Sequence, residues 1–275
     1  MKPPSFDLVI AETARDVTAC LKEHGTDAKI IAGGQSLMAM LNMRLVKPKV
    51  LIDISRVADL DYIRRDGDFV EIGATVIQAQ LEDWPELHSA LPIVAKAMPH
   101  IGHFQTRNRG TVCGSICHAD PSSELPLLLA TLGGEVVLTG QRGKRVLKAD
   151  EFQTGMLSTA CGEGEFVTAV RFPAAKAGQG FAFDEVARRH GDFAVVSLAA
   201  VATGQDVRLG VGGVADRPTV LELNSEQGSD LDDKLNAFAW ALGASDDIHA
   251  SARYRRELVR RLGKKLVNEA RDAAS

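Results

Sequence analysis

The chain has 275 residues, of which 45% are hydrophobic and 25% charged, and its formal net charge is −4 at pH 7. These values are typical of a globular protein with a sizeable core, and they lack the basic footprint of a nucleic-acid binder. No apolar stretch approaches the roughly 20 residues that span a bilayer, and the N-terminus has no apolar segment of a secretory signal. We therefore expect a cytoplasmic protein without a membrane span.

Residues 1–55 are predicted to form an N-terminal subdomain of alternating strands and helices. Gly25 ends the first helix, as a residue just past a helix C-terminus should, and Pro48 ends the second. After a first strand, the expected elements are a helix over 13–24, a strand over 28–32, a helix over 35–46 and a strand over 50–54.

A glycine loop with the sequence Ala-Gly-Gly-Gln-Ser lies at 32–36, at the end of the second predicted strand. Glycine lets the main chain approach a ligand closely. Backbone N–H groups clustered at such a turn attract phosphate oxygens. The loop is therefore a candidate phosphate-binding segment.

Residues 56–175 are predicted to form a second subdomain that begins with a hairpin and contains several helices. Turn residues at 65–68 separate the two hairpin strands, and Asp120, Ser122 and Ser123 are candidate caps of a buried helix. The expected strands cover 60–64, 69–73, 134–139, 145–148 and 165–172, and the expected helices cover 75–82, 90–98 and 124–132.

A second glycine loop, Arg-Gly-Thr-Val-Cys-Gly-Ser at 109–115, lies in this subdomain. Neither loop matches the dinucleotide fingerprint G-x-G-x-x-G or the P-loop motif, and either loop alone is typical of an ordinary turn. Both, however, place hydroxyl groups beside glycines next to apolar segments. Together they suit a diphosphate held from two sides, as in a dinucleotide.

Residues 176–275 are predicted to form a C-terminal α+β domain, in which helices back a three-stranded antiparallel sheet. The last helix is rich in arginine and lysine, which is typical of a solvated face; the alternative is a docking surface for an acidic partner protein. The expected strands cover 181–188, 194–203 and 206–214, and the expected helices cover 230–242 and 250–272.

The residue inventory contains no self-sufficient catalytic or metal-binding set. Cys113 and Cys117 lack a second pair that would complete a metal site, and both thiols are interpreted as buried. His118 with Asp120 could act as an acid–base pair, but a capping role for Asp120 is favoured. His100 and His103 are expected to bond the backbone. Redox chemistry borrowed from an organic cofactor is the simplest interpretation.

The chain resembles the FAD-binding medium subunit of molybdenum hydroxylases, as in aerobic carbon monoxide dehydrogenase, and the flavin domain of xanthine dehydrogenase. The similarity covers nearly the whole chain. It rests on the motifs at 32–36, 51–54, 106–111, 113–115, 118–121, 124–126, 188–194 and 254–256.

The resemblance implies a FAD-binding fold of the vanillyl-alcohol-oxidase type, with two α/β subdomains followed by the C-terminal domain. It implies that both glycine loops hold the diphosphate, that Ile101 and Phe193 lie beside the flavin, and that Ser123 and Glu124 reach ribityl or ribose hydroxyls. From the residues alone, a first-turn Glu124 that complements the helix dipole is an equal alternative. The implied cofactor-binding residues are Ala32, Gly33, Gly34, Gln35, Ser36, Ile101, Thr111, Gly114, Ser115, Ser123, Glu124, Phe166 and Val167 at the adenine end, and Phe193.

The resemblance also implies partner subunits. A large molybdopterin subunit would oxidise the substrate, and a small subunit would carry [2Fe–2S] clusters. Electrons would pass through these clusters to FAD and then to an external acceptor such as NAD or a quinone. A dimer of heterotrimers, that is a heterohexamer, is expected, and this chain would hold no catalytic residue of its own.

Two departures and two alternatives accompany this interpretation. Relatives commonly have Gly-Gly-Asn where this chain has Cys-Gly-Ser at 113–115, and some have a lysine near Asp184 and Glu185. One alternative is a self-contained FAD oxidoreductase, for which His190 with Asp192 is the nearest acid–base pair. The other is a nucleotide-binding interaction protein that uses the basic C-terminal helix.

Overall fold

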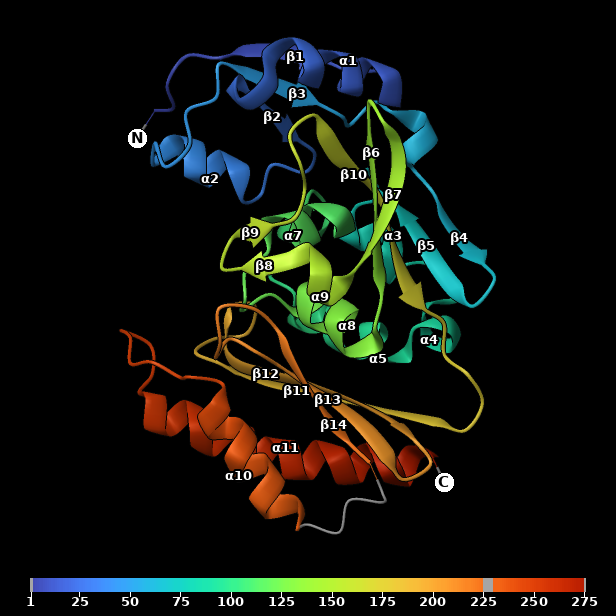
Figure 1. The fold of residues 1–275 in the computed structure, drawn as a ribbon, viewed down its shortest axis with the longest axis vertical. Helices are drawn as coiled ribbons and strands as arrows, with labels where there is room; N and C mark the ends of the chain where they lie inside the picture. Colours follow the sequence, from blue (N-terminus) through green and yellow to red (C-terminus); the bar gives the residue numbers. More distant parts are fainter. Residues whose placement is uncertain (1, 225–229, 275) are drawn as a thin grey trace.

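The computed structural model describes residues 2–224 and 230–274. Met1, 225–229 and Ser275 belong by range to the predicted domains but lie outside the described residues. Three larger sheets follow one another along the long axis of the molecule, with helices between and below them (Figure 1), and β8 and β9 form a small two-stranded sheet.

The strands are β1 (Asp7–Ile10), β2 (Ala28–Ile31), β3 (Val50–Asp53), β4 (Ile63–Asp66), β5 (Phe69–Gly73), β6 (Glu135–Gly140), β7 (Gly143–Lys148), β8 (Gln153–Gly155), β9 (Ser158–Thr159), β10 (Glu165–Pro173), β11 (Gln179–Ala187), β12 (Ala194–Thr203), β13 (Asp206–Gly212) and β14 (Thr219–Leu223). The α-helices are α1 (Ala14–His24), α2 (Leu37–Asn42), α3 (Gln78–Glu82), α4 (Leu87–Ala90), α5 (Pro92–Ala97), α6 (Phe104–Arg107), α7 (Val112–His118), α8 (Glu124–Leu132), α9 (Ala149–Phe152), α10 (Leu231–Ala241) and α11 (Ala252–Ala274). Short 3₁₀ turns are η1 (Gly25–Asp27), η2 (Ala58–Leu60) and η3 (Met98–His100).

The N-terminal sheet has β3 at its centre, with β1 and β2 on either side and all three strands parallel. Helix α1 starts at a capping box: the Thr13 hydroxyl accepts from the Asp16 N–H at 3.2 Å, and the Asp16 carboxylate accepts from the Thr13 N–H at 2.8 Å. Gly25, with φ of +49°, ends the helix. This capping fixes where α1 begins and which face, with Val17 and Leu21, is buried.

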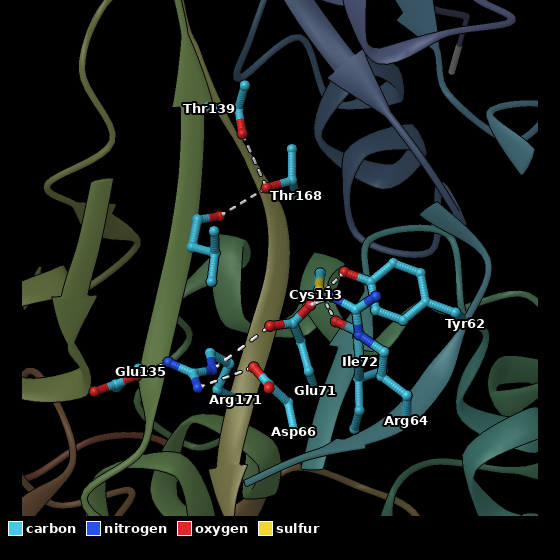
Figure 2. Close-up of polar contacts among 11 residues, drawn as sticks. Tyr62, Arg64, Asp66, Glu71, Ile72, Cys113, Glu135, Thr139, Thr168 and Arg171 are labelled. Atoms are coloured by element: carbon cyan, nitrogen blue, oxygen red, sulfur yellow. Dashed lines mark hydrogen bonds and ion pairs between the residues drawn. The ribbon is translucent and has the colours of Figure 1, made fainter. Parts of the chain in front are cut away.

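The middle sheet is antiparallel, in the order β4-β5-β10-β6-β7. A network of charged side chains joins its strands (Figure 2). Glu71 accepts hydrogen bonds from the Tyr62 hydroxyl and from Arg64, both at 2.7 Å. Arg171 lies 3.5 Å from the other Glu71 oxygen, 2.6 Å from Glu135 and 3.2 Å from Asp66. The network therefore links β4, β5, β10 and β6 through partnered charges.

The C-terminal sheet has four antiparallel strands in the order β11-β12-β13-β14, so the prediction of three strands was wrong. The missed strand, β14, is short, follows Pro218 closely and is only partly buried, so its hydrophobic alternation is weak. Helices α10 and α11 cover one face of this sheet (Figure 1). Leu235, Val259 and Leu266 of these helices belong to the hydrophobic core that they form with the sheet. Helices α5 and α8 pack on the opposite face.

Other predicted elements are present with different limits. Helix α2 is shorter than the predicted 35–46, and a turn at Leu91 divides the predicted helix over 90–98. The second glycine loop begins a helix, α7, that the sequence analysis did not assign. Of the helices in the described ranges, none combines the length and the apolar character needed to cross a membrane.

Candidate functional site

A cleft of about 930 Å³ lies where segments of all three predicted domains meet. A volume of this size is suited to a large cofactor. Every residue predicted to bind the cofactor lines this cleft: Ala32, Gly33, Gly34, Gln35, Ser36, Ile101, Thr111, Gly114, Ser115, Ser123, Glu124, Phe166, Val167 and Phe193. The fold therefore brings together two loops and several strand and helix ends that are far apart in the sequence.

The two glycine loops touch each other through their backbones. A Cβ atom added to Gly33 would lie 2.0 Å from the carbonyl oxygen of Arg109, a distance that no real contact reaches. The second loop is held in turn by hydrogen bonds from Gln78 N–H to Gly110 carbonyl at 2.8 Å and from Val112 N–H to Val76 carbonyl at 3.1 Å. Glycine at position 33 is therefore required for loop-to-loop packing.

The first loop presents unused backbone donors to the cleft. The N–H groups of Gly33, Gly34, Gln35 and Ser36 donate to no group within the described residues. Gly34 has φ of +72°, a conformation that glycine adopts without strain and that turns successive N–H groups toward one side. These donors fit the phosphate oxygens of a dinucleotide.

In the second loop, more of the polar groups form hydrogen bonds within the protein. Thr111 caps α7, with its hydroxyl oxygen accepting from the Gly114 N–H at 3.0 Å. The Thr111 hydroxyl hydrogen and the Ser115 side chain remain available to a ligand, and both residues line the cleft. This loop therefore offers fewer free donors than the first.

Ser123 and Glu124 form a buried polar wall at the start of α8, with exposures of 7% and 5%. The Ser123 side chain makes no capping bond, so its hydroxyl is free to bind a ligand. Burial, reinforced by the nearby carboxylates of Glu185 and Asp120, raises the pKa of Glu124 to about 8. A hydrogen bond from the Glu124 backbone opposes this shift, and the protonated carboxyl group can donate to a ligand hydroxyl.

A loop from the C-terminal domain, residues 188–193, lies against the turn at 100–103. Gly191 has φ of +82°, and a Cβ there would lie 2.8 Å from the carbonyl oxygen of Gly102. Phe193 on this loop is 60% exposed, while Ile101 on the turn is buried. The two segments together border one part of the cleft, and Phe166 and Val167 of β10 line it from the middle sheet.

The sequence analysis missed a further lining segment, residues 161–165. Glu165 accepts hydrogen bonds from Arg145 at 2.9 and 2.7 Å and from the Gly162 N–H at 2.9 Å, which fixes this turn. The alternation of Gly162 and Gly164 with glutamates was the signal that could have indicated it. Cys117 also lines the cleft and is exposed there, so the interpretation of this thiol as buried was wrong; Cys113 is buried.

Two of the histidine and acid predictions can now be judged. Asp120 accepts from the Ser122 N–H at 2.9 Å and so closes a turn before α8 rather than capping that helix, whose N-cap position is Ser123. Within the part of the chain that the structure describes, His100 makes no backbone hydrogen bond; its Nδ1 lies 3.3 Å from Glu185 Oε1 instead, so that prediction was wrong. Among the described residues, no group of three His, Cys, Asp or Glu side chains is arranged to hold a metal ion.

The basic C-terminal helix pairs largely with the chain itself. Arg255 is buried and donates to the carbonyls of Val195 and Gly213 at 2.7 and 2.6 Å. Lys264 and Lys265 form ion pairs of 2.8 Å with Asp232 and Asp184. These contacts weaken the alternative of a docking surface for an acidic partner.

The fold and the cleft are those of a protein that binds a dinucleotide cofactor. Residues 4–175 match the family described as the FAD binding domain in molybdopterin dehydrogenase, and residues 181–270 match the CO dehydrogenase flavoprotein C-terminal domain. The chain therefore belongs to the family of FAD-binding medium subunits of molybdenum-containing dehydrogenases.

The relatives cover the full length of the chain. The 6-hydroxypseudooxynicotine dehydrogenase complex subunit alpha of Paenarthrobacter nicotinovorans is 36% identical over 98% of this chain and 96% of its own. The carbon monoxide dehydrogenase medium chain of Hydrogenophaga pseudoflava is 32% identical, with 98% of each chain covered. A solved structure of carbon monoxide dehydrogenase from Hydrogenophaga pseudoflava that lacks the Mo-pyranopterin moiety matches all of both chains, with a TM-score of 0.92 and 30% identity. The chain is thus an FAD-binding oxidoreductase subunit.

Proposed function

We propose that the cleft holds FAD in an extended form, with the diphosphate between the two glycine loops. The observation that carries this proposal is the row of four backbone N–H groups at 33–36 that donate to no group within the described residues, in a cleft that Thr111 and Ser115 also line. Backbone donors in such a turn bind phosphate oxygens without a charged side chain. Bound FAD would supply reversible two-electron redox chemistry.

The remaining lining residues suggest the orientation of the cofactor. Ile101 and Phe193 would lie beside the isoalloxazine ring, while Ser123 and neutral Glu124 would hydrogen-bond the ribityl or ribose hydroxyls. Phe166 and Val167 would contact the adenine end. This arrangement corresponds to a fold of the vanillyl-alcohol-oxidase type, with subdomains 1–55 and 56–175 clasping FAD and a C-terminal domain over 176–275.

The proposed role is electron transfer within a larger complex. A large subunit would carry molybdopterin and a small subunit [2Fe–2S] clusters, and electrons would reach FAD through these clusters and leave to an external acceptor. Relatives are named as subunits of dehydrogenases acting on carbon monoxide and on 6-hydroxypseudooxynicotine, so the large subunit would set the substrate. A cytoplasmic dimer of heterotrimers remains the expected assembly.

The test is FAD binding by two glycine variants of the full chain. Gly33→Ala forces the loops apart, because its Cβ would lie 2.0 Å from the Arg109 carbonyl oxygen. We expect it to lose at least about tenfold in FAD affinity, equivalent to 1.4 kcal/mol. Gly155→Ala is the matched control, since its Cβ meets nothing closer than Asp216 Oδ2 at 3.5 Å.

Equal FAD affinity of both variants and the unsubstituted chain, measured by flavin absorbance after dialysis, would contradict the placement of the diphosphate. Co-purification of the intact complex is the companion experiment, because it identifies the partner subunits. Turnover of a substrate by the isolated chain with FAD would instead support a self-contained oxidoreductase.

A further inference from the structure

The N-terminal sheet has an open edge at β1, on the side away from the cofactor cleft. Among the described residues, β1 pairs only with β3. The N–H groups of Asp7 and Ala11 donate to carbonyls at the two ends of this neighbouring strand, at 2.8 and 2.9 Å. Because backbone groups alternate in direction along a strand, Leu8 and Ile10 point their N–H and C=O groups away from β3. Neither residue forms a backbone hydrogen bond on that outer side within the described part of the chain.

The two residues that have free backbone groups also expose apolar side chains. Leu8 is 56% exposed and Ile10 is 46% exposed, whereas Val9 between them packs against the core. Since side chains alternate between the faces of a strand, Leu8 and Ile10 lie on the same face. A free edge that carries large apolar side chains is a template for pairing with another strand.

The other edge strands of the three larger sheets are protected against such pairing. Strand β2 borders the cofactor cleft, which residues 29–31 line. The remaining edge strands carry charged side chains, which discourage pairing. These are Arg64, Arg65 and Asp66 of β4, Lys144, Arg145 and Lys148 of β7, Asp184 and Glu185 of β11, and Glu222 of β14. Strand β1 has no charged residue after Asp7, so among the described edge strands it is the one left unprotected.

A second copy of β1 has the features that this edge requires. In an antiparallel pair centred on Val9, Leu8 of each copy lies opposite Ile10 of the other, and each such pair exchanges two backbone hydrogen bonds. Opposed side chains lie on one face with Cβ atoms about 5 Å apart, so the four exposed apolar side chains pack together. In the same register Asp7 lies opposite Ala11, and no like charges face each other across the pair.

We propose that β1 is an interface between two copies of this chain, which pair antiparallel about a two-fold axis. The pairing joins the three strands of each N-terminal sheet into one continuous sheet. Such an interface is isologous, because the same surface of each copy contacts the other. Two four-residue strands bury less area than a standard interface. The dimer is therefore weak by itself and is reinforced in any complex that brings two copies together.

The interface and the cofactor cleft lie at opposite edges of the N-terminal sheet. The order β1-β3-β2 places β2, which borders the cleft, two strands away from the open edge. Pairing of two copies therefore leaves the cleft accessible and needs no bound FAD. The inference thus goes beyond the proposed function and does not depend on it.

Sedimentation equilibrium of the full chain without FAD, over concentrations that reach the high micromolar range, tests the interface. We expect the unsubstituted chain to dimerise reversibly. Leu8→Lys places a charge in the paired edge and should raise the Kd of the dimer by at least about tenfold. Ile10→Pro removes an outward N–H but no bond to β3, and should weaken the dimer similarly. Val146→Lys is the matched control, because it changes an exposed apolar residue of edge strand β7 and should leave the Kd within about twofold.

Hydrogen exchange of the Leu8 and Ile10 amides supplies a second measurement. Pairing should slow exchange at both amides as the concentration of the chain rises, and the slowing should be absent in Leu8→Lys. Urea unfolding checks that each variant is folded, and if Ile10→Pro is not, Leu8→Lys decides.

Four outcomes would overturn the proposal. The unsubstituted chain could remain monomeric at every concentration, the dimer could be unchanged in Leu8→Lys, or Val146→Lys could weaken it equally. The fourth is protection of the two amides only in the co-purified complex, which would assign the edge to a different subunit. FAD titration of the same chains tests the proposed function separately, so the two failures are distinguishable.

Discussion

Two buried carboxylates of this protein have opposite surroundings. Glu71 lies between β4 and β10 with a phenol and two guanidinium groups as partners (Figure 2), whereas Glu185 has a single histidine and one oxygen without a partner among the described residues. A carboxylate with cationic partners contributes to stability mainly because removing it strands their charge. A buried carboxyl group without cationic partners lowers the stability of the fold, and carboxyl groups in such surroundings are typical of functional sites. The comparison separates a carboxylate that is tied into the fold by its partners from one whose burial no cationic side chain offsets.

The largest expected effect concerns the partnered carboxylate. Glu71→Ala leaves Arg171, whose side chain is 21% exposed, without one of its partners, and it removes the acceptor of the Tyr62 hydroxyl. We expect a loss of about 3 kcal/mol in the free energy of unfolding, measured in urea. The control is Glu86→Ala, which breaks an exposed pair with Arg65 and should cost less than about 1 kcal/mol. Similar losses in both variants would contradict the structural role of the network.

The second prediction concerns the unpartnered carboxyl group and its pH dependence. The pKa of Glu185 is raised to about 7 in the folded state from an ordinary value of 4.5. Between these two values the folded chain binds more protons than the unfolded chain, so the free energy of unfolding falls as pH rises. Glu185→Gln removes this contribution and should make the chain more stable at pH 8, relative to pH 5, by about 1–3 kcal/mol.

Urea unfolding at the two pH values measures this difference. Glu71→Gln is the comparison variant, because it alters a carboxylate in the partnered network. Were Glu185→Gln to show the same fall in stability between pH 5 and pH 8 as the unsubstituted chain, Glu185 would not be the buried titrating group.

The third prediction concerns Glu124 in the wall of the cleft. Glu124 has a pKa of about 8, so it loses its donor hydrogen and gains a charge as pH rises above that value. We expect FAD affinity to fall by up to about tenfold per pH unit above pH 8, which is the limit for one linked proton. Glu124→Gln keeps a donor at every pH and should bind FAD with little pH dependence from pH 7 to pH 9.5. Fluorescence titrations of both chains decide this, and parallel pH profiles would contradict the role of Glu124.

The sequence predicted those parts of the structure that have strong local patterns and missed those that depend on tertiary contacts. The helix over 124–132 and the strand over 194–203 were predicted with their observed limits, because long buried segments have strong local patterns. Both glycine loops were indicated by their own residues, and the resemblance added the other cleft residues position by position. The pairing of His100 with Glu185 could not be predicted, since it joins η3 to β11 across two domains and depends on tertiary packing. The strand β14 was missed because an edge strand needs little burial, and the lining segment 161–165 was missed because its turn is fixed by Arg145 from another strand.

The smallest effect compares two residues at helix N-termini. Thr13 caps α1 through its hydroxyl, whereas Ser123 at the start of α8 makes no capping bond and faces the cleft. Thr13→Ala should therefore cost about 1 kcal/mol in the free energy of unfolding and leave FAD affinity unchanged. Ser123→Ala should do the reverse: stability without FAD stays the same within about 0.5 kcal/mol, and FAD affinity falls by several-fold through one lost hydrogen bond. Thermal unfolding of the FAD-free chains and fluorescence titration with FAD measure the two effects separately. If Ser123→Ala lowered stability as much as Thr13→Ala, its hydroxyl would belong to the fold rather than to the cofactor site.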